Sequence, residues 1–217
     1  AAQTSGVAGA LNVVRCPVAG TCYVVGASGV VLKTTDAGAT WVAQTSGVTN
    51  TLNGLTCADA DTCWVFGGAS NALILKTVNG GATWFVQKAA VGPTNVAFAN
   101  ATTGWAVGSA VLKTTDAGVT WMQQQPPSGT YNAAAALNAN TAWIVGNTGV
   151  IRKTTDGGTT WATQTSGTAS TLNDVAFVDA NIGWAIGASG TVLKTTDGGS
   201  NWVVQTSGST QSLTSIA

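Results

Sequence analysis

The chain has 217 residues, eight basic and eight acidic side chains, no His and a formal net charge of zero. A neutral chain offers no basic patch for nucleic acid or an anionic membrane surface, and no stretch is long and apolar enough for a transmembrane helix. All the acids are Asp. Without His or Glu, acid–base catalysis and transition-metal binding lose their usual side chains, so we expect no catalytic residue, no metal site and no cofactor.

A partial strand opens the chain, since residues 1–6 match residues 43–47 further along. Two Cys pairs follow, Cys16/Cys22 and Cys57/Cys63, at the same place in successive repeats. Such pairs serve either metal or redox chemistry or local disulfides. Zinc sites usually have closer ligands and His, so we favour two disulfides that each close a hairpin. Disulfides predict an extracytoplasmic location, which is secreted, periplasmic or cell-surface.

An eight-residue pattern recurs five times and ends each time in Trp, at intervals of 37 to 43 residues. Its acidic or amide position and its Trp are Asp36 and Trp41, Asn79 and Trp84, Asp116 and Trp121, Asp156 and Trp161, and Asp197 and Trp202. A period near 40 is typical of a four-stranded propeller blade. In the fifth repeat we expect strands over Leu172–Val178, Gly183–Ile186, Thr191–Thr195 and Trp202–Thr206.

Three further positions recur in every repeat. A second aromatic register opens the second strand, at Tyr23, Trp64, Trp105, Trp143 and Trp184. Both aromatic registers either form sugar-binding platforms or fill the space between sheets, and their strict periodicity favours filling. Lys recurs in the third strand (Lys33, Lys76, Lys113, Lys153 and Lys194), where we expect solvated blade edges.

An Asn near the start of the first strand is the third recurring position, at Asn12, Asn53, Asn95, Asn132 and Asn173. A ring of amides around a channel mouth is the candidate binding face for a sugar or a peptide. The alternative, which we favour, is that each Asn caps its own incoming loop.

The pattern T-x-D-x-G-x-T-W resembles the Asp-box, or BNR, repeat, and its longer context is closest to the photosystem II assembly/stability factor-like repeat proteins. The resemblance covers essentially the whole chain. It implies an all-β propeller of four-stranded antiparallel blades, in which each box is the turn between the third and fourth strands. It also implies that Asp36, Asp116, Asp156 and Asp197 bind turn amides, a role that Asn79 can also fill. The box serves unrelated activities, so it says little about function.

Repeats over residues 7–47, 48–89, 90–126, 127–167 and 168–208 predict a single propeller domain over residues 1–217, with a partial strand at each end. Five full repeats either close as a five-bladed ring or are an excerpt of a ring of six to eight blades. Both alternatives stay open at the level of sequence.

Glycoside hydrolysis needs two placed carboxylates, and the boxes use half of the Asp residues. Asp59 and Asp61 are expected at the box face, Asp174 near the axis, and Asp179 a strand length away. We therefore expect no enzyme. The leading hypothesis is a non-catalytic extracytoplasmic scaffold or protein-interaction propeller, part of a larger surface or membrane-associated assembly. The alternative is a lectin-like, carbohydrate-binding propeller, and a glycoside hydrolase fragment ranks third. A protein partner is expected before a carbohydrate one, with no nucleic-acid partner and no membrane insertion.

Overall fold

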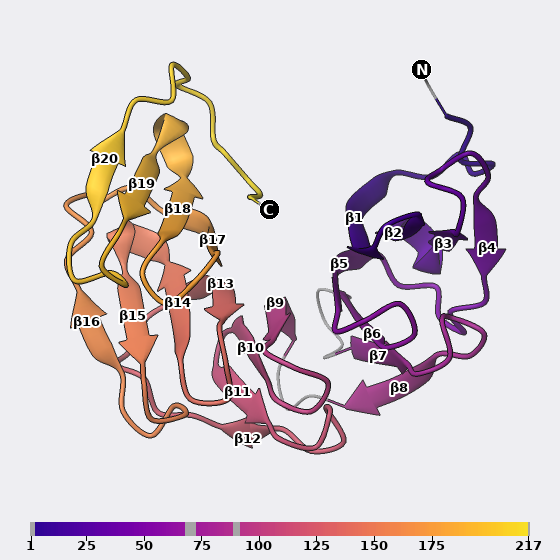
Figure 1. Ribbon diagram of the computed structural model, residues 1–217, viewed down its shortest axis with the longest axis horizontal. Helices are drawn as coiled ribbons and strands as arrows, with labels where there is room; N and C mark the ends of the chain where they lie inside the picture. The colour runs from indigo at the N-terminus through magenta and orange to yellow at the C-terminus, as the bar shows by residue number, and fades with distance from the viewer. Residues whose placement is uncertain (1–2, 68–72, 89–91, 217) are drawn as a thin grey trace.

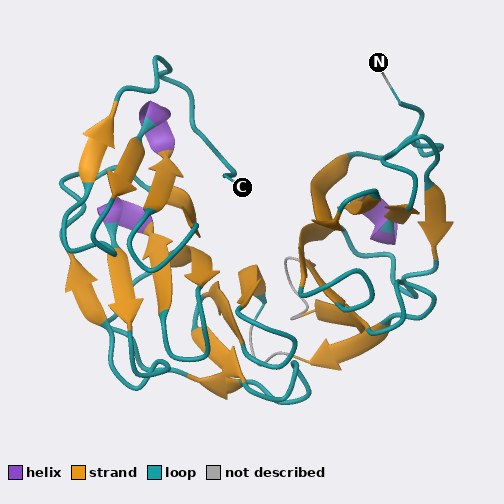
Figure 2. Cartoon of the chain, in the orientation of Figure 1, coloured by secondary structure: helices purple, strands orange, loops and turns teal. Residues whose placement is uncertain are grey.

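The computed structural model of the chain describes residues 3–67, 73–88 and 92–216. These residues form five four-stranded antiparallel sheets, which confirms the predicted fold class. Each sheet, here called a blade, is a meander of consecutive strands, and the blades follow one another around an axis (Figures 1 and 2). The expected boundary between the second and third repeats, at residues 89 and 90, lies outside the described residues.

The strands have these bounds. The first blade is β1 (Leu11–Val18), β2 (Thr21–Gly26), β3 (Val31–Thr34) and β4 (Val42–Gln44); the second is β5 (Leu52–Cys57), β6 (Cys63–Gly67), β7 (Leu73–Thr77) and β8 (Phe85–Lys88). The third is β9 (Pro93–Phe98), β10 (Gly104–Gly108), β11 (Val111–Thr114) and β12 (Met122–Gln123); the fourth is β13 (Tyr131–Ala136), β14 (Ala142–Gly146), β15 (Ile151–Thr154) and β16 (Ala162–Gln164). The fifth is β17 (Leu172–Phe177), β18 (Gly183–Gly187), β19 (Val192–Thr195) and β20 (Val203–Gln205). Its strands agree with the predicted ones to within a residue or two.

The helices in the described part of the chain are three-residue turns between second and third strands: η1 (Ala27–Gly29), η2 (Asn147–Gly149) and η3 (Ala188–Gly190). None of them is long or apolar enough to cross a membrane.

The hydrophobic core lies between the blades. Four clusters of buried side chains each join two successive blades, because a sheet that alternates inward and outward side chains buries both faces only when neighbours cover them. The first strands, β1, β5, β9, β13 and β17, contact one another in succession and surround the axis. We call the face of a blade toward the next blade its outgoing face, and the opposite one its incoming face.

The five blades form an open arc, not the closed five-bladed ring that the repeats allowed (Figure 1). Val14 on the incoming face of the first blade is 51% exposed, whereas Leu55, Val96 and Val175 at the same register position are 3–4% exposed. No blade among the described residues therefore covers the first blade from that side.

Candidate binding cavity on the propeller axis

Each innermost strand begins with a β-bulge, and the bulge positions the polar residue near the axis. In the first blade Leu11 pairs with Gly26 and Val13 with Val25, so that Asn12 is the extra residue. A bulge leaves its extra residue out of the ladder and re-aims its side chain. The same register skip in the other blades selects Asn53, Thr94, Asn132 and Asn173.

The third blade differs from the prediction by one residue. Its bulge holds Thr94, and the predicted Asn95 comes directly after it, opposite Val107. The sequence could have shown this shift. Asn95-Val-Ala-Phe98 aligns with Asp174-Val-Ala-Phe177, and in that alignment Thr94, not Asn95, corresponds to Asn173. Asn95 still lines the axis, where its Oδ1 accepts the Ala134 N–H of the next blade.

The bulge side chains of the first, third and fourth blades tie successive blades together, whereas we expected each Asn to cap its own loop. Asn12 Nδ2 donates to Leu52 O at 2.9 Å, and Asn132 Nδ2 to Leu172 O at 2.9 Å. Thr94 Oγ1 reaches Tyr131 O at 3.3 Å. The partner in each case is the first strand of the next blade, so the bulge residue links the innermost strands.

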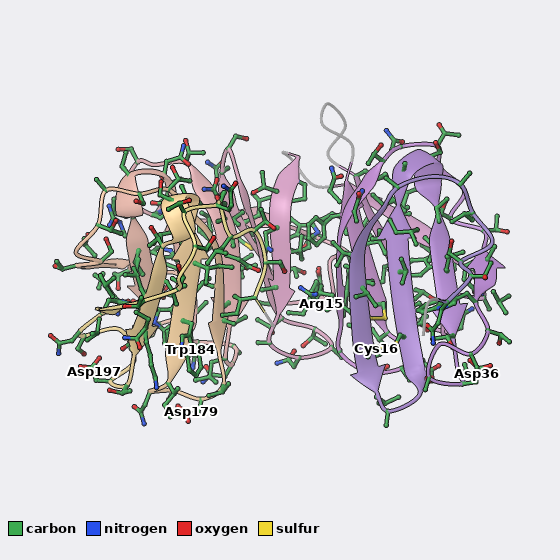
Figure 3. The ribbon with its side chains drawn as sticks, turned by 90° about the horizontal axis from the view of Figure 1, so that it is seen from above. Arg15, Cys16, Asp36, Asp179, Trp184 and Asp197 are labelled. Atoms are coloured by element: carbon green, nitrogen blue, oxygen red, sulfur yellow. A yellow bond between two sulfur atoms is a disulfide. The ribbon has the colours of Figure 1, made fainter. Side chains whose placement is uncertain are left out.

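A cavity of about 560 Å³ lies along the axis of the arc. All five predicted Asn residues line it, together with Thr94, Arg15 and Asp174. Arg15 stands on the innermost strand of the first blade, toward the middle of the molecule (Figure 3). Of the residues that line the cavity, Asp174 is the one acid and Arg15 the one base.

Asp174 is the electrostatically unusual group of the cavity. Its carboxylate accepts the Val175 N–H at 2.9 Å and the Ile216 N–H at 3.0 Å. Burial raises the pKa of Asp174 above its usual value, while these hydrogen bonds and the positive charge of Arg15 oppose the rise. A second carboxylate does not line the cavity, so the pair that glycoside hydrolysis requires is missing there.

Hydrogen-bond acceptors are what the cavity wall offers to a ligand. No described residue donates to Oδ1 of Asn12, Asn132 or Asn173, although their Nδ2 groups are engaged. These oxygens suit a ligand with N–H or O–H donors, such as an extended peptide backbone. The wall therefore offers a ligand more dipoles than net charge.

The Asp-boxes form the opposite end of the blades, where Asp36 and Asp197 lie with Asp179 (Figure 3). In the fourth blade Asp156 Oδ1 accepts the Thr160 N–H at 2.9 Å, and Oδ2 accepts the Thr160 hydroxyl at 2.6 Å. Side-chain and backbone hydrogen bonds lower the pKa of the four box carboxyls (Asp36, Asp116, Asp156 and Asp197) to about 2. Asn79 Oδ1 accepts the Thr83 N–H at 3.0 Å in the same way.

The carboxylates of Asp59 and Asp179 serve hairpins. Asp59 accepts the N–H groups of Asp61 and Thr62, and Asp179 those of Asn181 and Ile182. These bonds close the turn between first and second strands and lower the pKa of both carboxyls.

In the first four blades the second aromatic register packs between blades. Tyr23, Trp64, Trp105 and Trp143 are fully buried, so these rings cannot be sugar platforms. Trp143 stacks on Phe177 of the next blade with ring centroids 3.6 Å apart. The box Trp residues are buried or half-buried, and Trp202 meets Phe177 edge-on.

The recurring Lys residues do not form solvated edges, which corrects that expectation. Each Nζ lies 4.9–5.4 Å from the aromatic ring of its own blade's second strand. Lys33, Lys113 and Lys153 also donate to box carbonyls of the next blade at 2.8–2.9 Å. Burial lowers the pKa of Lys76 and Lys113. At Lys33, Lys113 and Lys153 the repeated position therefore serves the junction between blades.

Both predicted disulfides, Cys16–Cys22 and Cys57–Cys63, are present and cross-link the first two strands of their blades. Within residues 3–67, 73–88 and 92–216, no group of three acidic, Cys or His side chains could hold a metal ion.

The chain is similar in fold to several solved propellers. It resembles a structure of YCF48 bound to D1 peptide, with 18% identity, a TM-score of 0.68 and coverage of 92% of this chain and 67% of that one. YCF48 from Cyanidioschyzon merolae matches with 17% identity, a TM-score of 0.52 and coverage of 91% and 85%. The GH74 enzyme of Niastella koreensis matches with 18% identity and a TM-score of 0.73, over 91% of this chain and 38% of that one. No curated protein sequence matches the chain.

A family model gives the stronger relation. The model described as photosynthesis system II assembly factor YCF48 matches residues 86–166 and 160–216, which together are more than half of the chain. Together with the observed Asp-box blades, this match assigns the chain to a family. It belongs to the photosynthesis system II assembly factor YCF48 family.

Proposed function

We propose that the chain is a non-catalytic protein-interaction propeller that receives an extended segment of a partner protein in its axial cavity. The observation that carries the proposal is the convergence of bulge amides from successive blades, with Arg15 and Asp174, on one cavity of about 560 Å³. Extended peptides present alternating N–H and C=O groups, which side-chain amides can bind without regard to sequence.

Two further observations support a protein partner. The family is one of assembly factors, and a similar structure was solved with a peptide bound. An acid and a base in one cavity let it discriminate among segments by charge at two points.

We also propose an extracytoplasmic location. The support is the pair of local disulfides, which persist in oxidising compartments. In that location, the chain would act as a scaffold in an assembly at a cell surface or a membrane.

Peptide binding is tested with an immobilised library of random dodecapeptides, followed by calorimetry on the peptides retained. Asn53→Ala removes an exposed amide of the cavity, and Asp174→Asn removes its negative charge without changing its shape. We expect each variant to weaken binding about tenfold, as loss of one or two hydrogen bonds predicts. Asn140→Ala, an exposed amide on the box-face hairpin, is the matched control and should bind as the parent chain does.

A glycan array and an aryl-glycoside assay separate the alternatives. Binding to glycans with no retained peptide would replace the proposal with the lectin-like one, and turnover of a glycoside would replace it with a hydrolase. Equal peptide affinity for all three variants would place the binding site elsewhere.

A further inference from the structure

The third strand of the fourth blade carries a charge where the other blades carry an apolar side chain. Arg152 lies on the incoming face of its blade, in register with Ile144 and Ala134. Its equivalents in the other blades are at most 1% exposed: Leu32, Ile74, Leu112 and Leu193. A departure from the pattern of a repeat is expected at strained or functional positions. Arg152 is therefore a candidate for binding.

The protein satisfies the guanidinium of Arg152 only in part. Nη1 donates to Ile151 O at 3.2 Å, whereas Nε is buried without a hydrogen-bond acceptor among the described residues. Burial raises the pKa of the Tyr131 hydroxyl, and the positive charge of Arg152 opposes this rise, so the two groups are neighbours. Arg has five N–H donors, and a donor left unpaired away from water costs free energy. The guanidinium can therefore gain an acceptor from outside the chain.

Arg152 lines a groove of about 460 Å³, which lies between the turn η2 and the connection from the fourth to the fifth blade. The described residues that line this groove all come from the fourth blade and that connection, and none of them is acidic. The groove thus supplies no carboxylate for the cation. A negative charge that pairs with Arg152 in the groove must come from a ligand.

Hydroxyl groups stand beside the guanidinium in the same groove. Thr163 pairs directly with Arg152 across the β15–β16 ladder, and Thr165 lines the groove two residues further on. Both side chains are exposed, and neither hydroxyl bonds to another described residue. At the position of Thr163 the first blade has Ala43 and the fifth has Val204. Of the five blades, the fourth alone combines a cation and a hydroxyl at this pair of positions.

These donors favour a tetrahedral oxyanion. A carboxylate has two oxygens in one plane, and a guanidinium can engage both of them by itself. A phosphate group has further oxygens outside that plane, which can accept from hydroxyl groups beside the guanidinium. We propose that this groove binds a phosphate group, held by the Arg152 guanidinium and the hydroxyls of Thr163 and Thr165. The site is separate from the proposed peptide-binding cavity, because no residue lines both.

The test is an NMR titration of the intact chain with inorganic phosphate, glycerol 3-phosphate and acetate at constant ionic strength. The chain has two Arg residues, Arg15 and Arg152, so two Nε–H resonances are expected, and Arg152→Lys assigns them. Arg15, which lines the axial cavity, is the internal control. We expect phosphate to shift the Arg152 resonance to saturation at concentrations that leave Arg15 unmoved. Acetate should bind about tenfold more weakly, because it leaves the hydroxyls unpaired.

Two substitutions separate phosphate binding from a structural role. Arg152→Leu installs the residue of the first, third and fifth blades, so it should fold, and it should lose the rise in melting temperature that phosphate gives the parent chain. Thr163→Val keeps the shape of the side chain and should weaken phosphate binding about tenfold. Thr155→Val, at an exposed position outside the groove, is the matched control and should bind as the parent chain does.

The order of affinities identifies the source of the phosphate group. Tighter binding of glycerol 3-phosphate than of inorganic phosphate would indicate a phosphate ester, the reverse order would indicate the free ion, and both orders support the proposal. Equal shifts of the Arg15 and Arg152 resonances would overturn it, since phosphate would then act through general screening. Tighter binding of acetate than of phosphate would also overturn it, as would an undiminished effect of phosphate on the melting temperature of Arg152→Leu.

Discussion

The side chain at the Asp or Asn position of each Asp-box accepts hydrogen bonds from the residues of its own turn. In the fourth blade Asp156 accepts hydrogen bonds from three donors, the Thr154 hydroxyl and the N–H and hydroxyl of Thr160. Thr154 Oγ1 in turn accepts the Gly158 N–H at 2.8 Å. A single Oδ1 atom, of Asp or of Asn, is enough to accept the backbone N–H of the turn, as Asn79 does from Thr83.

This geometry makes a prediction for substitutions at Asp156. Asp156→Asn should lower the melting temperature by no more than about 1–2 °C, whereas Asp156→Ala should lower it by about 3 °C or more, because its turn amides lose their acceptor. Calorimetry of both variants measures the difference. Thr155→Ala, an exposed neighbour, is the control, and equal melting of Asn and Ala variants would contradict the prediction.

The box carboxyls also set the acid limit of stability. Their pKa values of about 2 lie below the usual 3.8, so the folded state holds them ionised more strongly than the unfolded chain does. The stability they contribute is fully present above about pH 5 and is lost as the pH falls through the range from about 4 to 2. Melting curves from pH 7 to 2 should show a plateau and then a drop.

The pKa of Asp174 is shifted in the opposite direction, so its effect on stability with pH is also opposite. Because burial raises its pKa, its ionisation destabilises the fold as the pH rises above the unfolded value. Asp174→Asn should therefore leave the melting temperature at pH 7 unchanged or raise it, which the same melting curves measure. A lower melting temperature at pH 7 would show that the ionised carboxylate is stabilising.

At the scale of the element, the environment of a residue depends more on whether a neighbouring blade covers it than on its position within its own blade. Trp143 and Trp184 occupy the same position in their sheets, yet only Trp143 has a following blade with Phe177 to stack on. Trp143→Ala should lower the free energy of unfolding by about 3–5 kcal/mol, as for a buried Trp. Trp184→Ala should lower it by about 1–2 kcal/mol, in proportion to the smaller area it buries. Urea titration of the two variants measures both values, and equal losses would mean that Trp184 is buried as deeply as Trp143.

The bulges show a second property of the element. A register skip at the start of each innermost strand takes a polar side chain, Asn or Thr, out of the ladder. In the first, third and fourth blades that side chain donates to the next blade. The strand ladder, and not the amide itself, is the conserved feature of the five blades. This is why an Asn-based alignment misplaced the third repeat by one residue.

At the scale of the molecule, the blades are coupled in a line. Each core cluster joins two neighbours, so a blade's stability comes from one or two junctions, as in other repeat proteins. The open arc gives the first and fifth blades one junction each and the inner blades two.

Backbone hydrogen exchange should follow this order. Amides of β9–β12 and β13–β16 should exchange about tenfold or more slowly than those of β1–β4 and β17–β20, because end blades open without disturbing the rest. Mass spectrometry of exchanged peptides at neutral pH measures the gradient. One common rate for all five sheets would indicate that the arc unfolds as a single unit.

The sequence by itself determined the local structure of this protein. The four strands of a blade, the box turns with Asp or Asn, and the disulfide pairs all depend on contacts between residues no more than 15 positions apart. Such contacts leave a pattern in the chain, and its repetition gives the period. The open arc, the inter-blade role of the Lys residues and the links that Asn12, Thr94 and Asn132 make to the next blade were decided by the tertiary structure alone. These features join residues about 40 positions apart, on different sheets, and a repeated sequence is the same whether a given face is covered or bare. Only the arrangement of blades in space distinguishes Trp143 from Trp184.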